Sequence, residues 1–133
     1  MSRRRTNSLA AALSVLVLGA PLITGCSYTT KNITLRRANQ AISDYTQAIA
    51  INPNDANAYY SRGISRRDLK DYQGAISDYS KAIEINPQYA LAYSNRGISK
   101  GSNGDIKGAC ADWKEASSLG DKEAAEWLRD QCQ

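Results

Sequence analysis

The sequence contains no histidine, and only three of its 133 residues are cysteines. Cys110 and Cys132 cannot complete a metal site without histidine, because a structural zinc ion takes four ligands. A nucleophile elbow and a phosphate-binding glycine loop are also missing, and the glycines of GSNGD at residues 101–105 indicate a turn that ends a helix. We therefore expect no catalytic residue, no metal and no cofactor. This excludes enzymes and proteins that act on a small-molecule substrate.

A strong excess of charge of one sign is missing as well. The 17 basic and 13 acidic residues give a formal net charge of +4, but Arg3, Arg4 and Arg5 lie in a segment that we expect to be removed. Subtracting these three (17 − 3) leaves 14 basic against 13 acidic residues. The remaining chain therefore offers no general reason to bind nucleic acid. Its length and its 42% hydrophobic content fit one domain with a packed core.

The N-terminus lacks an apolar run long enough to span a bilayer. Residues 9–23 supply about 15 apolar positions, whereas a spanning helix needs roughly 20, and Gly19 and Pro21 interrupt the run. A basic start followed by such a run is typical of a secretory signal peptide. The ending LITGC resembles the lipobox of bacterial lipoproteins. This resemblance implies cleavage after residue 25, lipidation of Cys26 and anchoring in a membrane by several acyl chains.

The location that the lipobox implies is the bacterial envelope, with the domain facing the periplasm or the cell exterior. Ser27, not aspartate, follows Cys26, so in a two-membrane bacterium the resemblance favours the outer membrane. Two alternatives stay open for this segment: an ordinary signal peptide, or an uncleaved anchor in which Cys26 is incidental.

The chain repeats itself at a period of 34 residues. Residues 41–66 and 75–100 are identical at 17 of 26 positions. Apolar and small residues recur there at three- and four-residue spacing, which predicts helices, and the proline at position 87 ends one of them. The period and the order of residue types resemble the tetratricopeptide repeat, through Tyr59-x2-Arg62-Gly63, Ala75-x3-Tyr79 and Pro87. The resemblance implies an all-α fold, a short solenoid of antiparallel helix pairs with a C-terminal capping helix.

The same resemblance divides the chain into segments. We expect a signal peptide at 1–25, a tether at 26–34, a half-repeat at 35–55, repeats at 56–89 and 90–121, and a capping helix at 122–133. Glycine and alanine in the repeats would let neighbouring helices approach closely. One aromatic side chain in each unit would then fill the gap between successive pairs, namely Tyr45, Tyr79 and Trp113.

Two arginines, Arg62 and Arg96, stand where the repeat normally has leucine. On a packing face such a charge needs a partner, because an unpaired buried charge is very costly. Three aspartates share the 34-residue period: Asp44, Asp78 and Asp112. We predict that the arginines pair with these carboxylates between adjacent helices. Such a ladder of structural ion pairs would set the register of the stack.

The two cysteines other than Cys26 form an even pair in a chain that we expect to be exported. Cys110 falls on the last full repeat and Cys132 at the end of the capping helix, so a disulfide would clamp this helix to the repeat. Two free thiols remain the alternative.

In tetratricopeptide proteins, the first helices of the pairs line a concave groove that takes a peptide or a helix of another protein. Carried over to this chain, the groove residues are Asn57, Tyr60, Ile64, Arg67, Leu91, Ser94, Ile98 and Gly101. The family's carboxylate clamp is not reproduced, because Tyr60 and Ile64 stand where its lysine and asparagine would be. Only Asn95 matches the clamp.

The sequence thus favours a binding module whose partners are a protein or peptide in the groove and a membrane reached through the lipid anchor. Two functions stay open. The first is a membrane-tethered adaptor or assembly factor in the envelope. The second is a fixed structural accessory subunit of an envelope complex.

Overall fold

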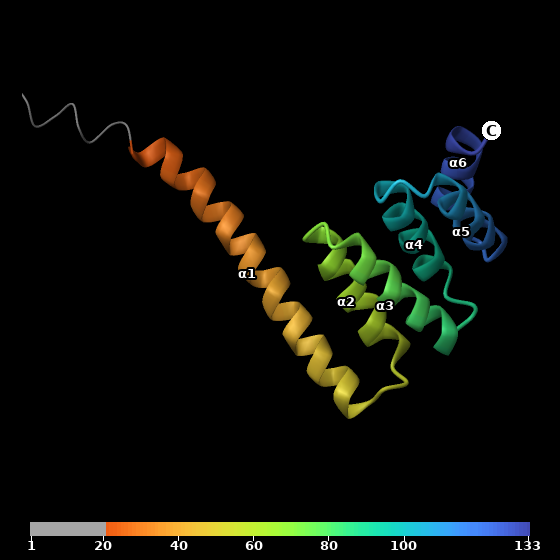
Figure 1. Ribbon diagram of the computed structural model, residues 1–133, viewed down its shortest axis with the longest axis horizontal. Coiled ribbons are helices and arrows are strands. Elements are labelled where there is room, and N and C mark those ends of the chain that lie inside the picture. The colour runs from red at the N-terminus through yellow and green to blue at the C-terminus, as the bar shows by residue number, and fades with distance from the viewer. Residues whose placement is uncertain (1–20) are drawn as a thin grey trace, which may run out of the picture. The chain divides into compact units, whose positions relative to one another are not determined.

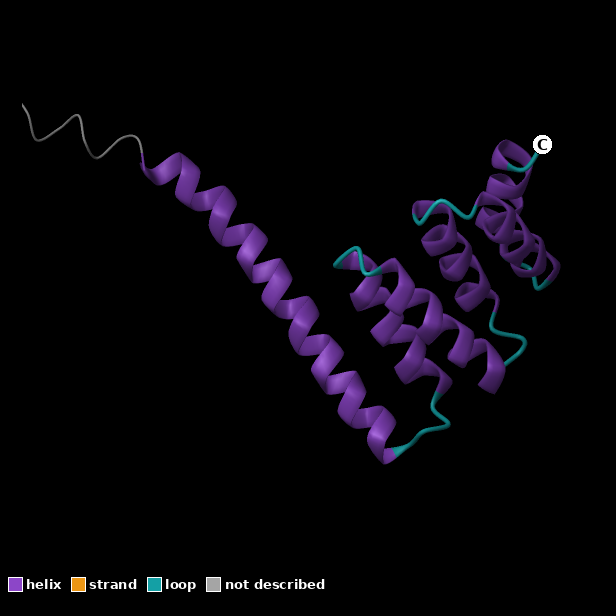
Figure 2. Ribbon diagram, viewed as in Figure 1, coloured by secondary structure: helices purple, strands orange, loops and turns teal. Residues whose placement is uncertain are grey.

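A computed structural model of the chain describes the backbone of residues 21–133 and the side chains of residues 29–133. All regular structure in this part is helical (Figures 1 and 2). The helices are α1 (Pro21–Ile51), α2 (Ala56–Asp68), α3 (Tyr72–Ile85), α4 (Ala90–Ser102), α5 (Ile106–Ser118) and α6 (Lys122–Gln131). The described residues fall into two units that divide between residues 35 and 36. The second unit holds the end of α1 and all of α2 to α6.

Aspartates begin most of the short helices of the second unit. The side chains of Asp55, Asp71, Asp105 and Asp121 each accept a hydrogen bond from a backbone amide in the first turn of α2, α3, α5 and α6 respectively. Such caps satisfy amides that have no partner within the helix. Between α4 and α5 the chain turns at Gly104, whose φ of 92° favours glycine. Caps and turns together convert each repeat into two helices.

The helices pack in sequential pairs, α2 with α3 and α4 with α5, and α6 packs against α5. The all-α repeat fold predicted from the sequence is confirmed. Its core consists of small side chains around one large aromatic residue in each pair. A Cβ atom added to Gly63 would lie 2.7 Å from Cε1 of Tyr79, and one added to Gly97 would lie 2.6 Å from Nε1 of Trp113. These glycines are therefore required for the close approach of the paired helices.

Helix α1 differs from the prediction. Residues 26–34, predicted as a tether, are helical and continuous with the helix that was expected to start at Leu35. The reason lies at Arg36-Arg37, the counterparts of Lys70-Asp71 one period later. Arginine cannot replace the capping carboxylate of Asp71, and residues 26–52 contain neither glycine nor proline, so nothing interrupts the helix.

Several predictions about the N-terminus lie outside the described residues. These are the signal sequence as far as residue 20 and the lipidation of the Cys26 side chain. Within residues 21–133, no helix combines the length and the apolar character that are needed to cross a membrane.

Candidate functional site

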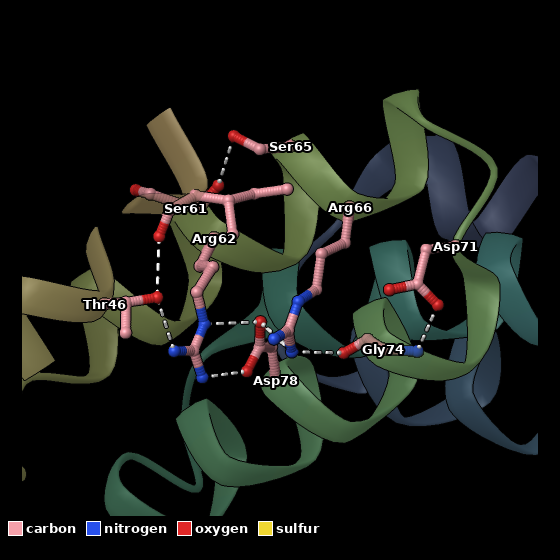
Figure 3. A network of polar contacts seen from close by, with 9 residues as sticks. Thr46, Ser61, Arg62, Ser65, Arg66, Asp71, Gly74 and Asp78 are labelled. Carbon is pink, nitrogen blue, oxygen red and sulfur yellow. Dashed lines mark hydrogen bonds and ion pairs between the residues drawn. The ribbon is translucent and has the colours of Figure 1, made fainter. Parts of the chain in front are cut away.

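The carboxylate of Asp78 on α3 is held by two arginines of α2 (Figure 3). Arg62 donates two hydrogen bonds to it, from Nη2 to Oδ1 at 2.7 Å and from Nε to Oδ2 at 3.0 Å. Arg66 Nη1 adds a third at 2.9 Å from Oδ2. Asp78 is only 2% exposed, and hydrogen bonding to Asp78 raises the pKa of Arg62. The ion pair between Arg62 and Asp78 links α2 and α3, the two helices of one repeat.

The next repeat reproduces this arrangement around Asp112 on α5. Arg96 of α4 donates from Nη2 at 2.7 Å and from Nε at 2.9 Å, and Lys100 Nζ lies 2.9 Å from Oδ2. Asp112 is 4% exposed. Each arginine also lies over the ring of the tyrosine three residues before it, at 5.6 Å for Arg62 on Tyr59 and 5.5 Å for Arg96 on Tyr93.

Each arginine also reaches back to the preceding repeat unit. Arg62 Nη1 donates to Thr46 Oγ1 of α1 at 3.1 Å, and Arg96 Nη1 donates to Ser80 Oγ of α3 at 3.1 Å. One guanidinium group therefore joins three helices: its own, the second helix of its repeat, and the second helix of the unit before. We call this set of contacts the arginine joint.

The third aspartate of the predicted ladder is placed differently. Asp44 on α1 is exposed and accepts a hydrogen bond from Gln40 Nε2 at 2.8 Å. No cation of residues 29–133 lies within ion-pair distance of it. Arg62 and Arg66 have Tyr28 and Asn32 as counterparts one period earlier, so the chain supplies no arginine at the places that would reach Asp44. The sharing of Asp78 with Arg66 and of Asp112 with Lys100 was not predicted, although these two cations recur at the same period.

The cysteine pair forms a disulfide between Cys110 on α5 and Cys132, the residue that ends α6, with a Cα–Cα distance of 5.7 Å. Trp127 on α6 packs against Trp113 on α5, with ring centroids 5.8 Å apart. The last helix is therefore fixed to the array by a covalent bond as well as by apolar contacts.

The predicted groove residues of α2 are tied to α4 by side-chain hydrogen bonds. Arg67 Nη1 donates to Asn95 Oδ1, and Asn95 Nδ2 donates to the Tyr60 hydroxyl at 3.1 Å. Tyr89 donates to Asn57 Oδ1 at 2.9 Å. Burial raises the pKa values of Tyr60 and Tyr89, so both phenols stay neutral at physiological pH. This surface is an ordered polar network.

Other predicted groove residues have varied surroundings. Leu91 is 53% exposed, and Ile64 is half-buried. Ser94 differs from the expectation, because it is only 3% exposed and its hydroxyl donates to the carboxylate of Asp121. The N-terminus of α6 lies against Ser94 and covers it. Ser94 is therefore not part of the accessible surface.

Ile98 and Gly101 of α4 line a different feature, a pocket of about 390 Å³ at the junction of α4, α5 and α6. Its other lining residues are Ser102, Ile106, Trp113, Trp127 and Gln131. The lining is mostly apolar and includes Trp113, whose indole Nε1 is buried without a protein partner. Among the residues that the structure describes, no cluster of three or more histidine, cysteine or acidic residues could hold a metal ion.

Comparisons with known proteins match the repeats. A family model described as tetratricopeptide repeat matches residues 56–89, and a second, described as TPR repeat, matches residues 37–66. A search of curated proteins found no match.

Among solved structures, the first TPR of Spaghetti (RPAP3) bound to the HSP90 peptide SRMEEVD is similar, with a TM-score of 0.70 and 26% identity. The match covers 83% of this chain and 86% of that chain. The TPR domain of Arabidopsis OM64 has a TM-score of 0.67 and 29% identity, covering 79% of this chain and 84% of that one. MamA has a TM-score of 0.63 and 29% identity, covering 72% and 56% respectively.

Proposed function

We propose that this tetratricopeptide repeat protein is a lipid-anchored protein of the bacterial envelope that binds another protein or peptide and has no catalytic activity. It acts as an adaptor or assembly factor. The observation that carries the binding function is the α2–α4 face, where Asn57, Tyr60, Arg67, Leu91 and Asn95 form one surface from two successive repeats. A preorganised surface loses less entropy when a partner binds.

The comparisons support this use of the fold. The first TPR of Spaghetti, 26% identical to this chain, is bound to a peptide of HSP90. The acidic sequence of that peptide is not carried over to this chain, because the lysine and asparagine of the family's clamp are replaced by Tyr60 and Ile64. The partner that we propose has an apolar side chain for Leu91 and a hydrogen-bond acceptor for Arg67.

The binding face is tested by a pull-down from membranes solubilised in mild detergent. Leu91→Glu places a charge on an exposed apolar position and should reduce partner recovery without unfolding the protein, since surface substitutions cost about 0.5 kcal/mol or less. Arg129→Glu is the matched control, because Arg129 is exposed on α6. Equal recovery with both variants would contradict a partner on the α2–α4 face.

The same pull-down separates the adaptor from the alternative, a fixed accessory subunit of an envelope complex. Weak recovery of several partners supports the adaptor. Stable recovery of one complex at constant stoichiometry supports the accessory subunit, in which one partner occupies the face permanently.

The lipid anchor is tested by Cys26→Ala. The lipobox resemblance of LITGC predicts that this variant loses lipidation and leaves the membrane fraction, or accumulates as an unprocessed chain. An unchanged mass and an unchanged membrane fraction would refute the lipoprotein assignment while leaving the binding function standing.

A further inference from the structure

The last part of helix α1 carries nearly the same sequence as α3 but lacks, within the described residues, one of the neighbours that α3 has. Residues 41–53 and 75–87 are identical at 10 of 13 positions. On α3, the side chains of Ala75, Tyr79 and Ala82 are fully buried. Their counterparts on α1, Ala41, Tyr45 and Ala48, are only half-buried. The same residue types are therefore more exposed on α1 than on α3.

The arginine joint identifies which side of α1 is open. On α3, Ser80 accepts from Arg96 of the following helix, and Asp78 accepts from Arg62 of the preceding one. On α1, Thr46 accepts from Arg62, so this side of α1 contacts the following helix, although less closely than α3 contacts α4. Asp44 faces the opposite side, and within residues 29–133 it meets no cation. Within residues 21–133, what α1 lacks is the first helix of its own repeat.

The segment before Asp44 cannot supply that helix. Residues 22–34 would have to turn back against α1, but they belong to the same continuous helix. They also lack the required side chains, because Tyr28, Thr29 and Asn32 stand at the positions of Arg62, Gly63 and Arg66. No helix of the described part of the chain covers this side of α1, which is therefore open to a helix from elsewhere.

We propose that the α1 face formed by Ala41, Asp44, Tyr45 and Ala48 docks a helix of a partner protein that carries the pattern Arg-Gly-x-x-Arg/Lys. The chain itself displays this chemistry twice, as RGISR at residues 62–66 and RGISK at residues 96–100. In both copies the arginine pairs with the aspartate through two hydrogen bonds, and the second cation binds the same carboxylate. A bidentate pair of this kind gives geometric as well as electrostatic selectivity.

The glycine of the pattern is as selective as the arginine. A Cβ atom at Gly63 would lie 2.7 Å from Tyr79, and Tyr45 is the α1 counterpart of Tyr79. A docking helix with a larger residue next to its arginine could not approach α1 closely enough to form the ion pair.

A second copy of this chain does not fit the site. Helix α6 begins at its cap Asp121 as α2 begins at Asp55, which aligns Leu128 with Arg62 and Arg129 with Gly63. Docked on α1, it would therefore present Leu128 where Asp44 needs a cation and Arg129 where Tyr45 needs a glycine. The arginines of α2 and α4 are already bound to Asp78 and Asp112. A different polypeptide remains as the occupant.

The test uses a fluorescent, hydrocarbon-stapled peptide with the sequence of residues 56–70, titrated with the full chain in detergent and followed by anisotropy. The expected result is saturable binding of one peptide per chain. Asp44→Ala in the protein should weaken binding about tenfold or more, and so should Arg62→Glu in the peptide. Gly63→Leu in the peptide should abolish binding. Asp130→Ala, at an exposed aspartate on α6, should leave binding unchanged.

Three results would overturn the proposal. The first is no binding at about 100 µM protein. The second is binding that is unaffected by Asp44→Ala but increases with Arg62→Ala in the protein. That change loosens the resident α2 and leaves Asp78 available, so the peptide would then be taking the place of α2. The third is a dimer of the unliganded chain in sedimentation that Asp44→Ala dissociates, which would make a second copy the occupant. A charge exchange, Asp44→Arg in the protein with Arg62→Asp in the peptide, should restore binding if the two residues pair.

Discussion

Residues 41–53 of α1 and residues 75–87 of α3 show how far a repeated sequence decides its own structure. Both stretches are helical up to the isoleucine before Asn-Pro, and both place a serine or threonine hydroxyl under the arginine of the next helix. They differ in burial: Tyr79 is 0% exposed and Tyr45 is half-buried. The sequence specifies the helix and the contact surface, whereas the core forms only where helices lie on both sides.

The largest effect should come from the aromatic residue of each stretch. Tyr79→Ala removes a fully buried ring from the centre of a repeat and should lower the free energy of unfolding by about 3–5 kcal/mol. Tyr45→Ala removes a ring that is only half-buried and should cost less than half as much. Urea denaturation of both variants measures the difference, and equal losses would mean that α1 is as well packed as α3.

The opposite end of the array should respond to loss of its covalent clamp. Cys132→Ser removes the disulfide with Cys110, which closes a sequence separation of 22 residues, and should cost on the order of 3 kcal/mol in the loop-entropy model. The loosening should begin at α6, because an end helix has a neighbour on one side only. Amide exchange should become faster around Trp127 while Tyr79 stays protected. If titration of the oxidised, folded wild-type protein detects two reactive thiols, the disulfide is absent.

The two aspartates test the arginine joint. Asp78→Ala leaves Arg62 and Arg66 without their shared carboxylate and should cost about 2 kcal/mol, part of the loss being screened because Arg66 is partly exposed. Asp44→Ala removes an exposed carboxylate and should change stability by less than about 0.5 kcal/mol. Thermal or urea unfolding of the two variants provides the comparison. A negligible cost for Asp78→Ala would mean that the arginine joint does not contribute to stability.

The smallest effect concerns the start of each stretch. Asp71 caps α3 by accepting from the amide of Gly74 at 3.0 Å, and Asp71→Ala should cost about 1 kcal/mol. Its counterpart Arg37 lies inside α1, so Arg37→Ala should change stability by about 0.5 kcal/mol or less. A substantial loss with Arg37→Ala would indicate a contact that the helix interior does not explain.

Much of this organisation was predictable because it repeats. The 34-residue period gave the helix pairs, the aromatic core positions and the arginine–aspartate partners, since a contact made within one repeat recurs in the next. The departures arise where the period breaks. Arg37 replaces a capping aspartate, so α1 runs through the predicted tether, and Tyr28 replaces an arginine, so Asp44 meets no cation of the described chain.

Contacts that do not recur from repeat to repeat were harder to predict from the sequence. Ser94 was predicted on the groove because its place in the repeat favours it, yet Asp121 of the last helix covers it. The hydrogen bond between Ser94 and Asp121 joins residues that the 34-residue period does not relate, so the repeat pattern does not predict it. The sharing of one carboxylate by two cations was also missed, although the recurrence of Arg66 and Lys100 at the same period was a usable signal.

Neighbouring helices, and not the sequence of the stretch itself, decide how well residues 41–50 and 75–84 are packed. Native-state hydrogen exchange, measured by mass spectrometry on peptides from the two segments of one sample, tests it most directly. We expect the amides of residues 75–84 to exchange at least about a hundredfold more slowly than those of residues 41–50, because opening α3 requires disruption of both flanking interfaces. Equal protection of the two segments would contradict it.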